Sequence, residues 1–224
     1  MKLLVTLVAT AVIASAIAGY LRILRPRHVR WGATDDEVRR PMSGDVLVQD
    51  PVMAATRGIS VCARPDEIWL WLVQMGYKRA GFYSYDWIDN ARVPSADHIL
   101  PGFQGLKAGD VVPTGPRGDG FSVVSLEPNR SLVMEVHHTR FHVTFSTLLD
   151  PVNEEETRLV MRVRVAVRFN PLTALYYALL EPGDFVMMRK MMLGIKQRSE
   201  AMADERRAHT RVFEDVLLEA MKYG

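Results

Sequence analysis

The segment of residues 157–169 alternates between apolar and charged side chains over its whole length. Its apolar face carries Leu159, Met161, Val163, Val165, Val167 and Phe169, and its charged face carries Arg158, Arg162, Arg164 and Arg168. Successive side chains of a β-strand point to opposite faces, so this pattern predicts a strand with one buried and one wet face. We expect the arginine face to be a solvated convex surface, with Glu135 and the acids at 154–156 available as partners. The alternative is a site for an anion or a lipid headgroup.

Five further strands are expected before this one, separated by short turns. They are predicted at residues 57–63, 110–114, 121–127, 131–138 and 141–149. Residues 116–120, 128–129 and 150–153 are rich in glycine, proline, asparagine and aspartate, which favour turns. Parallel strands need crossovers of a dozen or more residues, so these short connections predict an antiparallel meander.

Two helices are predicted to pack against this sheet. The first starts at Pro65 and stops before Gly76, with apolar residues at helical spacing. The second is long and opens at residues 181–184, after a short apolar helix or turn at 170–180. Its apolar row contains Phe185, Met188, Met192 and Ile195, widened by Met187 and Met191. These methionines either line a site that adapts to an apolar ligand or pack in an ordinary hydrophobic core. Their spacing in the sequence does not distinguish the two alternatives.

The two ends of the chain carry their own signals. Residues 3–21 are apolar or small and uncharged, which fits either a cleaved signal peptide or a retained signal anchor. We favour the anchor, because the apolar run continues past Ala16, and the arginines that follow it place the domain on the cytoplasmic side. At the other end, residues 204–222 form an amphipathic helix. That helix is a dimerisation or partner-docking element, or an extension folded back on the domain.

Composition limits the classes of function. The chain has 28 Lys and Arg against 26 Asp and Glu, a net charge of +2, which gives no general argument for nucleic-acid binding. The single cysteine, Cys62, excludes an intrachain disulfide and a cysteine-based zinc site. Nucleophile-elbow, metalloprotease, P-loop and dinucleotide motifs are not found in the sequence.

Five stretches carry a resemblance to a known family. They are WGATDDEVRRPMSGD at residues 31–45, ISVCARPDEIWLWLVQMG at 59–76, GFYSYDWIDN at 81–90, SADHILPGFQGLKAGDVV at 95–112 and LEPGDFVMMRKMMLGIK at 180–196. With the order of elements above, they resemble the START-like (SRPBCC; polyketide cyclase/dehydrase and lipid transport) superfamily, in a bacterial subgroup that is often membrane-anchored.

The resemblance implies an α+β helix-grip fold, in which a curved antiparallel sheet wraps around a long C-terminal helix, here with an N-terminal transmembrane helix. The resemblance covers roughly residues 31–200 and does not explain the final tail. Together with the signals at the two chain ends, it divides the chain into an anchor at 1–24, a linker lying over the domain at 25–54, a ligand-binding domain at 55–203 and a C-terminal amphipathic extension at 204–224. It also implies a cavity for a hydrophobic ligand between the long helix and the concave face of the sheet.

The residues expected to line this cavity come from the first helix, the aromatic stretch within residues 81–90, the last strand and the long helix. They are Trp69, Phe82, Tyr83, Tyr85, Trp87, Met161, Val163, Phe185, Met188 and Met192. For catalysis, the candidates are Asp86, Tyr83, Tyr85 and His98, because burial raises a carboxylate pKa and a phenol stabilises an enolate. A structural Asp86 and surface tyrosine hydroxyls are the simpler expectation.

Metals and cofactors are not expected. His137 and His138 are adjacent on a strand and point to opposite faces, and a zinc site with His142 and Glu135 would depend on the cross-strand register. The leading hypothesis is therefore a membrane-anchored domain that binds or transfers a lipid or polyketide-like ligand. The alternatives are a cyclase or dehydratase that uses the candidate acid, tyrosines and histidine, or an accessory subunit of a membrane complex. The expected partners are the ligand, the membrane and a protein partner or second copy at the C-terminal helix.

Overall fold

The structure is a computed structural model that describes residues 6, 11, 12, 14, 15, 17–167 and 171–223. Its centre is a six-stranded antiparallel sheet with the order β1-β6-β5-β4-β3-β2. The strands are β1 (Met53–Val61), β2 (Val111–Pro113), β3 (Gly120–Glu127), β4 (Ser131–His137), β5 (Phe141–Pro151) and β6 (Thr157–Val167). The predicted meander is confirmed, and β1 closes it by pairing with β6.

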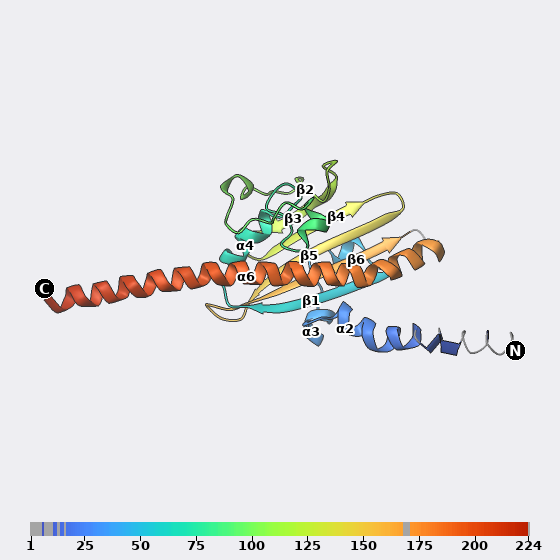
Figure 1. Ribbon diagram of the computed structural model, residues 1–224, viewed down its shortest axis with the longest axis horizontal. Coiled ribbons are helices and arrows are strands. Elements are labelled where there is room, and N and C mark those ends of the chain that lie inside the picture. Colours follow the sequence, from blue (N-terminus) through green and yellow to red (C-terminus); the bar gives the residue numbers. More distant parts are fainter. Residues whose placement is uncertain (1–5, 7–10, 13, 16, 168–170, 224) are drawn as a thin grey trace.

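One long helix, α6 (Pro171–Tyr223), lies along the sheet, as Figure 1 shows. At about 1.5 Å per residue its 53 residues span about 80 Å. Met192 and Ile195 on its inward face have no exposed surface, and neither do Leu159 and Met161 of β6. The smaller helix α4 (Pro65–Val73) packs beside it through Ile68 and neighbouring apolar residues, and completes the core.

The expected break in this helix at residues 181–184 is wrong, because α6 continues through Pro182. A proline inside a helix removes one backbone donor and crowds the preceding turn. Two ion pairs bracket this point and offset the loss: Glu181 pairs with Arg25 at 2.8 Å, and Asp184 pairs with Arg57 at 2.7 Å.

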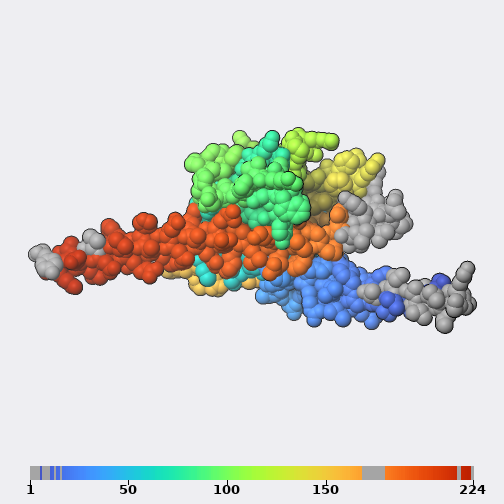
Figure 2. Space-filling model, viewed as in Figure 1, coloured from blue at the N-terminus to red at the C-terminus, as the bar shows by residue number. Residues whose placement is uncertain are grey.

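The C-terminal third of α6 projects beyond the sheet (Figures 1 and 2). Val212, Phe213, Leu218 and Met221 are each more than half exposed there. Of the two interpretations of residues 204–222, folding back on the domain is therefore wrong. The docking role stays a prediction.

The N-terminal segment covers the convex face of the sheet. It contains η1 (Tyr20–Leu24), α2 (Arg25–Val29), α3 (Asp35–Arg39) and η2 (Asp45–Leu47). Helix α3 begins with the capping box that the sequence indicates, in which Thr34 accepts from the Glu37 amide and Glu37 accepts from the Thr34 amide. This segment lies between the arginines of β6 and water.

The expectation that the arginine face is solvated is therefore wrong. The Arg162 guanidinium is only 5% exposed and donates to Asp45 at 2.6 Å and to the Glu37 carbonyl at 2.7 Å. Arg158 pairs with the Glu37 carboxylate at 2.9 Å, and Arg164 donates to the Val48 carbonyl. Arg168 lies outside the described residues. The acids come from the N-terminal segment, while Glu135 binds His142, and Glu155 binds Arg206 and Arg207.

The predicted transmembrane helix at residues 1–24 falls partly on positions outside the described residues, namely 1–5, 7–10, 13 and 16. No helix within the described part of the chain combines the length and the apolar character needed to cross a bilayer.

The aromatic stretch, residues 82–89, forms a lid that lies against α6. Its backbone comes so close to the helix that a methyl group on Gly194 would lie 2.8 Å from Cβ of Tyr83 and closer still to the Tyr83 carbonyl oxygen. Ser84 strengthens the contact by donating to the Met187 carbonyl at 3.0 Å. The lid therefore needs a glycine at position 194.

A pair of glycine substitutions in α6 tests this contact. Gly194→Ala should destabilise the fold by about 1 to 3 kcal/mol because the added methyl overpacks the lid. Gly183→Ala in the same helix meets no atom within 4 Å and should stabilise it by about 0.5 to 1 kcal/mol through helix propensity. Urea denaturation measures both. Equal stabilisation by the two alanines would show that the lid does not pack closely on α6.

Candidate functional site

A cavity of about 260 Å³ lies between α6, the lid and the concave face of the sheet. Ten apolar side chains line it: Met75, Phe82, Phe121, Met134, Val143, Phe145, Val163, Met187, Met188 and Met191. Four polar side chains join them: Ser84, Asp89, Thr114 and Asp184. This is the composition expected of a small-molecule site, namely apolar walls with a few polar groups, and its volume is just below the usual range of about 300 to 1,000 Å³.

Most of the lining side chains lie on strands of the sheet or on α6. On the sheet, Phe145 of β5 lies directly opposite Met134 of β4 and Val163 of β6, so the three side chains share one face. The Phe121 ring on β3 extends this surface, with its centroid 6.0 Å from that of Phe145. Opposite them, residues 184, 187, 188 and 191 of α6 follow the i, i+3, i+4, i+7 spacing of one helical face.

The residues predicted to bind ligand divide into three groups. Phe82, Val163 and Met188 line the cavity. Trp69, Tyr83, Met161 and Met192 lie in the buried core and are not among the lining residues.

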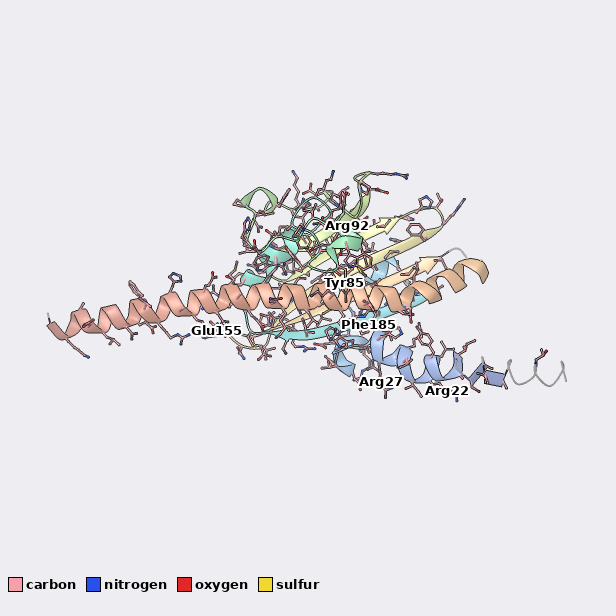
Figure 3. The ribbon with its side chains drawn as sticks, in the orientation of Figure 1. Arg22, Arg27, Tyr85, Arg92, Glu155 and Phe185 are labelled. Carbon is pink, nitrogen blue, oxygen red and sulfur yellow. The ribbon has the colours of Figure 1, made fainter. Side chains whose placement is uncertain are left out.

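The third group, Tyr85, Trp87 and Phe185, lies away from the cavity walls. Trp87 is 68% exposed. Figure 3 shows Tyr85 and Phe185 on opposite sides of α6. Phe185 faces the N-terminal segment, where it contacts the rings of His28 and Trp31.

Tyr83 has a structural position rather than a catalytic one. Its hydroxyl is buried, donates to the Trp71 carbonyl at 3.0 Å and accepts from the Gln74 amide at 2.9 Å. Burial raises the pKa of Tyr83 to about 12, so the phenol stays neutral at physiological pH. Arg198 lies over its ring at 4.7 Å. These contacts fix the lid between α4 and α6.

Asp86 and His98 also lie outside the cavity. Both carboxylate oxygens of Asp86 are taken by Ser95, one by its hydroxyl and one by its backbone amide. Asp86 therefore ties the lid to the following loop, which is a structural role. The His98 side chain is 70% exposed and pairs with Asp97, and it does not line the cavity.

Asp89 is one of the four polar lining residues, none of which the sequence analysis nominated. It closes the short helix α5 (Asp86–Asp89) and lines the cavity, and its Oδ1 is buried without a hydrogen-bond partner. Loss of hydration, with a smaller contribution from the neighbouring Asp86 charge, raises the pKa of Asp89 to about 6. The signal in the sequence was weak: two aspartates three residues apart, with nothing to show which one faces inward.

The second carboxylate of the cavity, Asp184, is compensated. It accepts a hydrogen bond at 2.7 Å from Arg57 on β1, a residue with no exposed surface. Arg57 also donates to the His28 carbonyl at 2.9 Å. The guanidinium thus lies behind Asp184 and is not among the side chains that line the cavity.

The histidines do not assemble a metal site. His137 and His142 are cross-strand partners whose rings stack at 4.4 Å, and His142 contacts Glu135 at 2.7 Å. His138 stacks on Phe141 instead. Within the residues that the structure describes, no group of three or more His, Cys, Asp or Glu side chains is arranged to hold a metal ion.

No family model matches this chain. No curated protein matches it either.

Solved structures do match. A hypothetical protein from Helicobacter pylori has 12% identity and a TM-score of 0.46, covering 71% of this chain and 95% of its own. A START superfamily protein from Mycobacterium smegmatis has 14% identity and a TM-score of 0.32, covering 62% and 98%. The di-domain ARO/CYC BexL from the BE-7585A biosynthetic pathway has 15% identity and a TM-score of 0.39, covering 66% and 46%.

The architecture is α+β: a six-stranded antiparallel sheet and the long C-terminal helix α6 that lies along it. This is the helix-grip arrangement that the resemblance implies. The likeness to the START-like superfamily is therefore a likeness of fold.

Proposed function

We propose that this protein binds or transfers a hydrophobic ligand in the cavity between α6 and the sheet. The observation that carries the proposal is the lining itself, in which ten of the fourteen side chains are apolar. A cavity with such walls gains free energy when an apolar molecule fills it, because apolar surface leaves water.

The methionines of the lining support a ligand of variable shape. Met187, Met188 and Met191 form the helical wall, and Met134 faces them from β4. An unbranched thioether adapts to irregular shapes more readily than a branched side chain. Aliphatic chains and fused rings are therefore both suitable occupants.

We also propose that the N-terminal helix anchors the protein to a membrane with its domain on the cytoplasmic side. The support comes from the uncharged residues 3–21 and from the exposed apolar side chains Leu21, Ile23 and Leu24. Arg22 and Arg27 follow, and Figure 3 shows both on this helix. Figure 1 shows the N-terminal helix and the start of α6 at the same end of the molecule. A tether raises the concentration of the cavity at the bilayer, so modest affinity suffices for lipid exchange.

A second candidate is an enzyme of the cyclase or dehydratase type. Asp89 favours it, because a cavity-facing carboxylate whose pKa lies near 6 is suited to general acid or base catalysis near neutral pH. Asp89 takes the place of Asp86, Tyr83, Tyr85 and His98 in this hypothesis, and its amide variant, described below, would abolish turnover.

Filling the cavity should weaken ligand binding. Met187→Trp places a larger side chain into the lining and should weaken binding of an apolar ligand by about tenfold or more. Val186→Trp is the matched control, because Val186 is 48% exposed and is not a lining residue. Native mass spectrometry of co-purified lipid, with a fluorescent apolar probe, measures both. Unchanged binding by Met187→Trp would place the ligand elsewhere.

An anchored chain should stay with the membrane under alkaline extraction. After carbonate treatment of cells that express the full chain, we expect the protein in the pellet, because a spanning helix resists removal of peripheral contacts. Substituting Val8 and Val12 by aspartate places two charges near the middle of the apolar run and should release the protein. Recovery of the unaltered chain in the supernatant would contradict the anchor.

Removing the Asp89 charge should stabilise the protein at neutral pH. The folded pKa of about 6 lies above the ordinary 3.8, so the contribution of Asp89 to stability is fully present below about pH 4 and is lost as the pH rises through 6. Asp89→Asn does not titrate, so its advantage should grow to about 2 °C in melting temperature at about pH 7.5, a small value because solvent screens a half-buried group.

The matched control is Asp97→Asn. Asp97 is 93% exposed, and its hydrogen bond with His98 lowers its pKa, so this variant should show no gain at neutral pH. A melting temperature of Asp89→Asn that follows wild type at every pH would show that Asp89 is not desolvated by the cavity.

A further inference from the structure

The charged side chains that line the cavity are acidic. Two carboxylates, Asp89 and Asp184, are among the lining residues, whereas no lysine, arginine or histidine is found among those that the structure describes. Arg57 forms an ion pair with Asp184, so these two residues together add little net charge to the cavity. Asp89 is not neutralised in this way.

Asp89 is surrounded by groups that disfavour its charge. Its Oδ1 has no hydrogen-bond partner within the described structure, and no basic side chain pairs with it there. The nearest ionisable neighbour is Asp86, whose oxygens are used by Ser95. The cavity therefore contains an ionised carboxylate without a counter-ion at neutral pH.

We propose that the cavity selects a cationic amphiphile, an apolar molecule with a protonated amine, and that Asp89 binds the ammonium group. This inference rests on the proposed ligand-binding function and names the charge of the ligand. An ammonium group beside this cavity-lining carboxylate supplies the missing positive charge. The rings of Phe82, Phe121 and Phe145 line the same space, and aromatic faces attract cations.

The opposite charge is disfavoured by the same groups. A fatty acid or a phosphate ester would bring a second anion beside Asp89 and Asp86, and like charges in a partly desolvated site repel strongly. Arg57 pairs with Asp184 and is not among the described side chains that line the cavity, so it offers no counter-charge there. A neutral alcohol avoids the repulsion but gains no ion pair.

A matched set of ligands tests the charge preference. The full chain, held in a phosphatidylcholine nanodisc, is titrated at about pH 8 with octylamine, octanol and octanoate by isothermal titration calorimetry, with empty nanodiscs as the blank. Octylamine should bind at least about tenfold more tightly than octanoate, with octanol between them, since hydrogen bonds to charged groups contribute about 1.5 to 3 kcal/mol.

Two variants locate the preference. Asp89→Asn should bring the affinity for octylamine to within about threefold of the affinity that the same variant shows for octanol. Asp97→Asn, at an exposed aspartate outside the cavity, should keep the wild-type order. An amine preference that survives Asp89→Asn would overturn the role of Asp89.

The remaining outcomes separate the inference from the proposed function. If octanol binds and octanoate binds as tightly as octylamine, the charge selection is wrong and the hydrophobic-ligand function stands. If none of the three ligands binds, the proposed function fails and the inference fails with it.

Discussion

The buried guanidinium of Arg57 joins three parts of the molecule. It sits on β1 with no exposed surface, donates to the His28 carbonyl in α2, and pairs with Asp184 in α6. A buried charge that loses its partner costs about 3 to 5 kcal/mol, so neither helix can move away from β1 without a large penalty. Glu181 adds a second link between α6 and the N-terminal segment through Arg25. The N-terminal helix and the cavity wall that carries Asp184 are therefore parts of one rigid unit.

Local periodicity was enough to predict the sheet, because strand alternation is a property of neighbouring residues. The alternation in β6 identified its apolar face, which does pack on α6, and the order of short strands gave the meander. Local periodicity could not predict that the arginine face of β6 would be covered and paired with acids. The capping box at Thr34 and Glu37 was visible in the sequence, but its carboxylate is shared with Arg158, 121 residues away. Spacing carries no information about such a partner.

In the lid, too, the sequence did not predict which side chains face the cavity, even within one helical turn. The aromatic content of the lid predicted a segment near the ligand, and Phe82 does line the cavity, whereas Trp87 points outward. Asp86 was nominated because it lies among the aromatic residues, yet a loop residue, Ser95, takes both of its oxygens. Which of two aspartates faces inward depends on the path of the chain after the helix. That path is a tertiary property and leaves no periodic signal in the sequence.

The cavity places an unsatisfied acid among apolar walls, and this combination is unfavourable for folding alone. A domain selected only for stability would gain by replacing Asp89 with a neutral residue, since its carboxylate loses hydration and receives no hydrogen bond at Oδ1. The lost hydration is also what makes the carboxylate selective, because a group that water does not solvate discriminates more sharply between an amine and an acid. The instability of the empty site and the selectivity of the occupied site thus have one physical origin. For this reason Asp89, rather than the more numerous aromatic residues, is the position in the lid where binding chemistry is expected.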